Sequence, residues 1–217
     1  MTNGGGVMEG LIELQKACDI SAGLVLKRKE AKSNDEVVKT YKMITLKSFD
    51  VDGWIDLKYL DNYKSTEILD ERYLTKENDI LIRLSSPYTA IKITAGHSGF
   101  VIPSLFAVIR VKKDSINPDY LTFMLNNENI KRSYFKNSMG LTIPMIRMQT
   151  IRATQIPLIS GNKQFILSKI YNLMIKEKRL YQQLQLEKEK YNKEITKRII
   201  MGGNKNAKYK MDSKRSK

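Results

Sequence analysis

Three residues in the stretch VDGWIDLK could hold a metal ion. Asp52, Asp56 and Lys58 are the residue types of metal-dependent nucleases, in which two carboxylates bind a divalent ion and a lysine polarises the attacking water. The two aspartates are too close in sequence for the usual arrangement on two strands. The spacing therefore favours a surface turn, and a nuclease site stays the alternative.

A second stretch, Asn117–Tyr120 (NPDY), differs at one residue from the Asn-Pro-Pro-Tyr loop with which amino-DNA methyltransferases grip a flipped base. No glycine-rich strand-to-helix turn that could hold S-adenosylmethionine precedes it. Asparagine followed by proline and aspartate is typical of a helix start. We therefore predict a helix cap here.

The chain has one histidine, His97, and one cysteine, Cys18. A histidine without a cysteine or acidic neighbour does not form a convincing metal site, and one cysteine allows neither an intrachain disulfide nor a zinc cluster. Gly161–Lys163 lacks the glycine spacing of a phosphate-binding loop. We therefore predict that the chain is not an enzyme, with no catalytic residue, metal ligand or cofactor of its own.

Basic, amide and hydroxyl side chains gather on the predicted loops. Such groups can contact DNA phosphates and the edges of bases, although each cluster alone also fits a solvated surface. The candidate DNA-contacting residues are Lys27, Arg28, Lys29, Lys92, His97, Ser98, Lys136, Asn137, Ser138, Thr142 and Arg147.

These loops need a scaffold, which residues 11–160 are predicted to form. β-branched and apolar runs predict strands at 37–46, 79–84, 90–94, 100–111 (split at Pro103) and 155–159, and helices from Pro118 and over 130–135. The predicted class is α+β: a β-rich domain followed by a long helix.

The long helix is the clearest element. No proline or glycine interrupts 163–200, which would span about 57 Å as a helix. Its apolar residues average 3.5 residues apart, a spacing that predicts a seam facing another helix in a coiled coil, with packing against its own domain as the alternative. The predicted seam residues are Ile166, Ile170, Leu173, Leu180, Leu184, Tyr191 and Ile195.

Charge is unevenly distributed along the chain. The 217 residues carry a net charge of +15, of which residues 161–217 supply +11 through 16 basic and 5 acidic side chains. A basic extension favours a polyanion as partner, although basic charge also serves solubility. We predict a flexible leader at 1–10, a globular domain at 11–160, the helix at 161–201 and a disordered basic tail at 202–217. The sequence has no apolar run long enough for a membrane span, and we predict a cytoplasmic protein.

In their order and spacing, several stretches of the chain resemble the specificity subunit of type I restriction-modification systems, in a half-length form. The similarity covers about residues 11–200, although Asn78 stands where this family usually has glycine, and only Gln164 remains of its usual Glu-Glu-Gln before the helix. The stretches that carry the resemblance are 14–20 with Gly23, 73–74 with 79–83, 102–110, 118–126, 138–144 and 155–158.

The resemblance implies a target recognition domain that reads a half-site of double-stranded DNA, and a helix that acts as a spacer. Family members usually carry two such domains and two helices, so this chain would pair with itself, helices antiparallel, or with a second half-specificity chain. The target would then be bipartite. S-adenosylmethionine, ATP and Mg²⁺ would belong to separate methyltransferase (modification) and restriction subunits. The remaining alternative is an adaptor that binds nucleic acid by charge alone.

Overall fold

A four-stranded antiparallel sheet forms the centre of the domain. The computed structural model describes residues 10–33, 35–112, 116–138 and 144–212. Alternate residues of the central strands face two different apolar clusters: Ile80, Ile82 and Ile109 belong to one cluster, and Leu81 and Val108 to the other. A strand buried on both faces reads as a continuous apolar run, which is why these strands were predictable. In order across the sheet, the strands are β2 (Cys18–Ala22), β7 (Phe106–Val111), β5 (Ile80–Arg83) and β6 (Ala90–Lys92).

Short helices cover one face of this sheet. Tyr120, Leu121 and Tyr134 are at most 1% exposed and pack with the sheet residues in the first cluster. The strands β1 (Leu11–Glu13) and β8 (Gln155–Pro157) pair with each other beside these helices. The helices are α1 (Leu14–Ala17), α2 (Pro118–Leu125), α3 (Glu128–Lys136) and α4 (Met148–Arg152).

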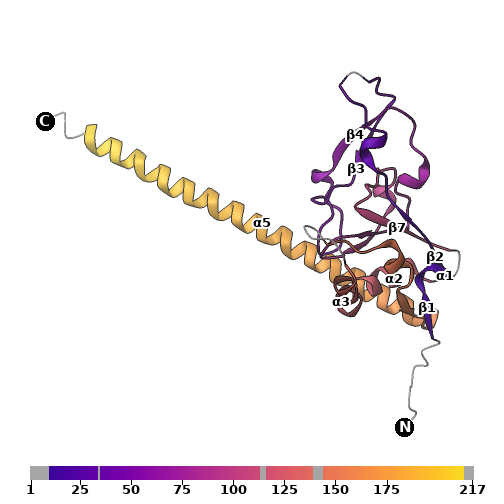
Figure 1. Ribbon diagram of the computed structural model, residues 1–217. Coiled ribbons are helices and arrows are strands. Elements are labelled where there is room, and N and C mark those ends of the chain that lie inside the picture. Colours follow the sequence, from indigo (N-terminus) through magenta and orange to yellow (C-terminus); the bar gives the residue numbers. More distant parts are fainter. Residues whose placement is uncertain (1–9, 34, 113–115, 139–143, 213–217) are drawn as a thin grey trace, which may run out of the picture. The chain divides into compact units, whose positions relative to one another are not determined.

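A separate two-stranded sheet is formed by β3 (Lys39–Met43) and β4 (Asp61–Ser65). Figure 1 shows this pair at the end of the domain away from β1 and α1. Behind it lies a third apolar cluster, which includes Tyr41, Tyr63 and Val101. Four 3₁₀ turns complete the domain: η1 (Leu26–Arg28), η2 (Leu57–Tyr59), η3 (Glu71–Tyr73) and η4 (Ala95–His97).

Two backbone positions explain features of the sequence. The backbone of Gly23 lies very close to the backbone of Pro103. A Cβ atom at position 23 would stand 2.2 Å from the carbonyl oxygen of Pro103. Asn78 has a φ of 67°, in the left-handed region. Asparagine tolerates this region better than most residues, so it can stand where the resembling family has glycine.

Helix α5 (Gly161–Asp212) begins directly after Ser160, as predicted. The predicted end at Gly202–Gly203 is wrong, because the helix continues through both glycines; a glycine costs a helix only about 1 kcal/mol. The leader at 1–9, the glycine loop at 139–143 and residues 213–217 lie outside the described residues. In the part of the chain that is described, no helix has the length and apolarity required to cross a membrane.

The chain divides into two units, Met1–Leu173 and Met174–Lys217, and the division falls within α5. The domain boundary at residue 160 stays a prediction. The first unit holds the sheets, the short helices and the start of α5. The second unit holds the rest of that helix, which ends at Asp212 in the described residues. The predicted strands at 37–46, 79–84, 90–94 and 155–159 are confirmed as β3, β5, β6 and β8, whereas β1, β2, β4, α1 and α4 were not predicted. The stretch 100–111 is confirmed as a strand in its second half, β7; before it, Val101 and Pro103 form isolated bridges.

Candidate nucleic-acid interface

The first group of predicted DNA-contacting residues lies beside β4. Lys27 and Arg28 are exposed on η1. Lys29 forms an ion pair with Glu67, and its ammonium lies 5.9 Å from the ring centroid of Tyr73. Lys27 and Arg28 therefore point their charge to solvent, whereas the charge of Lys29 is partly neutralised within the fold.

His97 and Ser98 follow β6, at η4. The Nδ1 atom of His97 lies 3.1 Å from the hydroxyl oxygen of Thr94, and the carbonyl oxygen of His97 accepts a hydrogen bond from the hydroxyl of Thr75. The ring packs at a centroid distance of 6.2 Å from Phe100. These contacts fix the turn and leave Ser98 exposed.

Lys92 has a partner within the fold. Its ammonium is 2.7 Å from the carboxylate of Asp119, and the two side chains are only 23% and 21% exposed. Asp119 also accepts a hydrogen bond from the amide of Asn172 on α5, at 3.1 Å. Lys92 therefore helps to connect β6, α2 and α5, a role that its position in the sequence does not reveal.

The second group surrounds the end of α3. The side-chain amide of Asn137 donates to the carbonyl oxygen of Ser133, and the hydroxyl of Ser138 donates to the carbonyl oxygen of Phe135. Both side chains are therefore used in ending the helix. Lys136 and Arg147 are exposed. Thr142 lies outside the described residues. The candidates thus form two groups, one beside the third apolar cluster and one on the helical side, with Lys92 inside the fold.

The residues of the possible nuclease site form a turn instead. The carboxylate of Asp56 accepts a hydrogen bond from the backbone N–H of Lys58 and caps η2, and the ammonium of Lys58 lies 4.6 Å from the ring centroid of Tyr59. Asp52 belongs to the preceding turn, where its backbone N–H donates to Asp50. Across the described ranges, no group of three or more acidic, histidine or cysteine residues could hold a metal ion.

The stretch that resembled a methyltransferase loop is a helix cap, as predicted. The side-chain oxygen of Asn117 accepts hydrogen bonds from the backbone N–H groups of Asp119 and Tyr120, at 2.8 and 3.1 Å. Asn117 is thereby committed to the start of α2.

Gln164 links the start of α5 to this cap. It is 7% exposed; its Oε1 accepts from the backbone N–H of Asn117 at 2.9 Å, and its Nε2 donates to the carbonyl oxygen of Ile159 at 2.8 Å. One turn later, the hydroxyl of Ser168 donates to the carbonyl oxygen of Gln164 at 2.7 Å. These bonds give a physical role to the one glutamine retained from the pattern of the resembling family.

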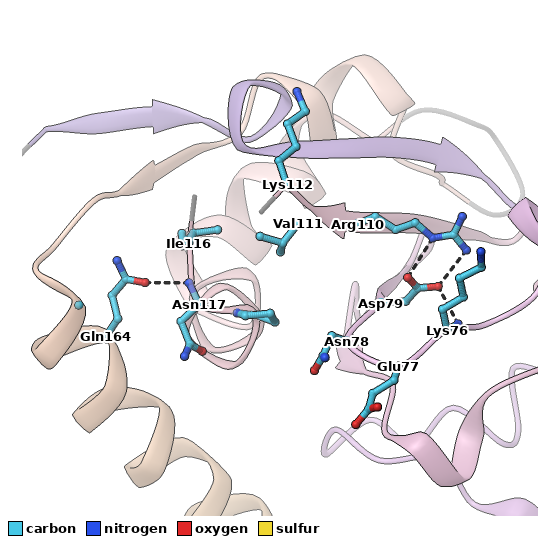
Figure 2. A pocket seen from close by; sticks show the side chains of 12 residues that line it. Lys76, Glu77, Asn78, Asp79, Arg110, Val111, Lys112, Ile116, Asn117 and Gln164 are labelled. Atoms are coloured by element: carbon cyan, nitrogen blue, oxygen red, sulfur yellow. Dashed lines mark hydrogen bonds and ion pairs between the residues drawn. The ribbon is translucent and has the colours of Figure 1, made fainter. Parts of the chain in front are cut away.

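An open cavity of about 710 Å³ lies beside this contact between Gln164 and Asn117. Figure 2 shows Gln164 and Asn117 on one side of it, and Arg110 with Asp79 on the other. The Arg110 guanidinium makes two hydrogen bonds to the Asp79 carboxylate, at 2.9 and 3.0 Å. Asp79 is 3% exposed, so this pair fixes a buried charge at the start of β5.

Burial holds two ionisable side chains, those of Cys18 and Tyr171, in their uncharged forms. Burial raises the pKa of Cys18 to about 12, despite the lowering effect of the Lys112 charge. Burial also raises the pKa of Tyr171 to about 12, and its hydroxyl accepts from the amide of Asn126 at 2.8 Å. Cys18 therefore stays a protonated thiol near neutral pH, which is a poor nucleophile.

The predicted seam residues of α5 are exposed. Their exposed fractions range from 38% at Ile195 to 67% at Tyr191. In the first unit, α5 contacts the domain through Gln164, Ser168 and Tyr171. At about 100° per residue, Ile166, Ile170 and Leu173 lie on the opposite side of the helix. The helix thus presents one face to its own domain and keeps a separate apolar face.

The sequence profile of the family described as "Type I restriction modification DNA specificity domain" matches residues 12–197. No curated protein matches the chain. Among solved structures, the chain is similar to the HsdS subunit from Thermoanaerobacter tengcongensis (14% identity, TM-score 0.59, covering 86% of this chain and 48% of that one).

Two further solved chains share this fold. One comes from a structure of complex assembly and conformational transition of the type I R-M system (16% identity, TM-score 0.58, 86% and 44% covered). The other is a Type-I restriction-modification system S subunit from M. genitalium (12% identity, TM-score 0.52, covering 84% of this chain and 42% of that one). The present chain therefore spans less than half the length of each of these solved chains.

Proposed function

The chain belongs to the family of type I restriction modification DNA specificity domains, and from that premise we propose that it is the DNA-recognition (specificity) subunit of a type I restriction-modification complex. It reads a half-site of a bipartite target in double-stranded DNA and docks the methyltransferase subunit. The observation that carries this proposal is the match of the family profile over residues 12–197, which spans the first unit and most of α5.

In this proposal the chain recognises the DNA sequence, and other subunits carry out the reactions. The methyltransferase and restriction subunits bind S-adenosylmethionine, ATP and Mg²⁺ and join the complex as separate chains in the cytoplasm. The local contacts of Asp56, which caps η2, and of Lys58, which lies over the ring of Tyr59, support this division of roles.

The proposal includes pairing through α5. A second copy, or a second half-specificity chain, covers the apolar seam of Ile166, Leu173, Leu184 and its neighbours as an antiparallel coiled coil. The exposure of these residues supports this, because an apolar stripe with a 3.5-residue repeat needs a partner helix. Two-fold pairing of identical chains makes the target a gapped palindrome.

The test is to express the chain with its cognate methyltransferase subunit in a host that lacks DNA methylation, and to map modified adenines across the genome. A gapped palindromic motif is the expected result. An asymmetric motif would show that another specificity chain completes the complex. No motif, together with affinity that falls steeply with salt and has no sequence preference, would favour the charge-only adaptor.

Cleavage of DNA by the purified chain with a divalent metal ion, lost in Asp56→Asn, would instead support the nuclease alternative. The capping role of Asp56 predicts no such cleavage.

A further inference from the structure

The outer face of the two-stranded sheet, here called the β3–β4 ribbon, is uniformly polar. Thr40 lies directly opposite Lys64, and Lys42 directly opposite Asn62. All four side chains are exposed, and their backbone positions alternate with the buried Tyr41 and Tyr63. Because side chains alternate between the two sides of a strand, these four share one face.

The inner face of the ribbon is held firmly. Tyr41 and Tyr63 lie opposite each other and are 6% and 2% exposed. The hydroxyl of Tyr63 donates to the carbonyl oxygen of Leu26 at 2.8 Å, and that of Tyr41 accepts from the backbone N–H of Leu69 at 3.0 Å. The outer side chains therefore project from a backbone that the core fixes, as a precise recognition surface requires.

Both edges of the ribbon are also tied to the domain. On one edge, the backbone N–H of Ala31 donates to the carbonyl oxygen of Lys64 at 2.9 Å. On the other edge, the backbone N–H of Val101 donates to the carbonyl oxygen of Lys42 at 2.8 Å. A two-stranded ribbon alone is marginally stable, and these bonds make it part of the first unit.

The outer face carries mostly hydrogen-bond donors. The Lys42 ammonium donates to Oδ1 of Asn62 at 3.0 Å, which uses one ammonium proton and turns the amide NH₂ outward. The remaining protons of Lys42 and the NH₂ group of Asn62 can donate to acceptors. In the major groove, guanine presents N7 and O6 and adenine presents N7, so this pair suits purine edges.

The ribbon has the dimensions of a groove-binding element. Five paired residues span about 17 Å at 3.4 Å per residue, the length of about five base pairs. Two strands about 4.8 Å apart, with their side chains, fit a major groove about 12 Å wide. Two-stranded ribbons are an established way of reading DNA in other proteins.

From this geometry we propose that Thr40, Lys42, Asn62 and Lys64 form the base-reading face of the domain, with the ribbon lying in the major groove of one half-site. Lys42 and Asn62 read a purine edge, and Thr40 and Lys64 contact the adjoining base or phosphate. The proposal rests on the proposed function, because it names the surface that performs the recognition. None of the four was among the residues predicted from the sequence.

The test uses the chain in complex with its methyltransferase subunit. The target is first defined by adenine mapping with the unmodified chain, and affinity is then measured for a duplex carrying that target and for a shuffled duplex of the same length. Asn62→Ala should lower the ratio of the two affinities by about ten-fold or more, because a good base contact discriminates by about that factor. The remapped motif should become degenerate at one position in each half-site.

Lys16→Ala is the control for Lys42→Ala, since Lys16 is an exposed lysine on α1, which lies outside the ribbon. Lys42→Ala should lower the affinity ratio and relax the motif, whereas Lys16→Ala should leave both unchanged. Thermal melting of each variant establishes that the domain is folded.

The two proposals fail in different ways. If the unmodified chain yields no motif, the proposed function fails. If it yields a motif that stays intact in both Asn62→Ala and Lys42→Ala, the ribbon is not the base-reading face and the inference is overturned. Equal loss of affinity for target and shuffled DNA in Lys42→Ala would also overturn it, because that result marks a phosphate contact.

Discussion

The start of helix α5, as far as Leu173, and the β3–β4 ribbon each bury one face and expose the other, yet their exposed faces have opposite chemistry. The helix is anchored by Gln164, Ser168 and Tyr171 and exposes apolar residues such as Leu173. The ribbon is anchored by Tyr41 and Tyr63 and exposes lysine, threonine and asparagine. Anchoring to the domain therefore uses one face of each element, and the other face is left for a partner: in our proposals, another helix for the apolar face and DNA for the polar face.

The largest effect is expected on the apolar face. Leu173→Glu should abolish pairing, because an unpaired charge buried in a seam costs about 3–5 kcal/mol. Sedimentation velocity of the purified chain measures this as conversion of a dimer into a monomer. Gln182→Glu adds the same charge on the opposite side of the helix and should leave the dimer intact. A Leu173→Glu chain that stays dimeric would show that the seam is wrongly assigned.

A smaller effect is expected on the anchored face of the helix. Gln164→Ala removes two hydrogen bonds and leaves the partly buried backbone N–H of Asn117 without its acceptor. The free energy of unfolding of the domain should fall by about 1–3 kcal/mol, measured by urea denaturation. Asn162→Ala changes an exposed neighbour and serves as the control. Equal stabilities for both variants would contradict the anchoring role of Gln164.

The anchor of the ribbon should contribute less. Tyr63→Phe removes one hydrogen bond to the carbonyl oxygen of Leu26 and should lower the free energy of unfolding by about 1 kcal/mol. The matched change Tyr59→Phe, at an exposed tyrosine, should have no measurable effect. If Tyr63→Phe leaves stability unchanged but relaxes the DNA motif, the hydroxyl positions the ribbon rather than stabilising the fold.

The smallest effect tests whether DNA contacts extend beyond the ribbon. Arg147→Ala or Lys136→Ala should weaken DNA binding roughly three- to five-fold for target and shuffled duplexes alike. Either change should also reduce the slope of log affinity against log salt concentration by about one. Lys214→Ala, in the tail, should weaken binding less. Deletion of 213–217 that proves equally damaging would indicate that binding depends on overall charge.

The sequence allowed the locally determined parts of the fold to be predicted. Residues 79–84 and 106–111 are mostly apolar, as expected of buried strands. The side chain of Asn117 caps the helix that follows it, so the cap depends on neighbouring residues alone. By contrast, β4 (DNYKS) contains residues typical of turns. It is a strand because Tyr63 pairs with Tyr41 and closes over the third apolar cluster, a contact that no local pattern shows.

The candidate site was harder to predict for the same reason. Lys92 looked like an exposed DNA contact, but Asp119, distant in sequence, neutralises it. The outer face of the ribbon could be recognised only once the register of β3 against β4 was known, because that register places Lys42 beside Asn62. The predicted α5 seam depends only on spacing within one helix; its residues are exposed, and their pairing stays a prediction.

The alternation of buried and exposed residues along β3 and β4 also bears on how such a protein can evolve. Exposed substitutions generally change stability by less than about 0.5 kcal/mol, whereas the buried tyrosines opposite them tolerate little change. The four outward positions can therefore be exchanged in many combinations without unfolding the domain. If the ribbon reads DNA as proposed, a lineage of these chains acquires new sequence preferences by point mutation while its core and helix α5 stay the same.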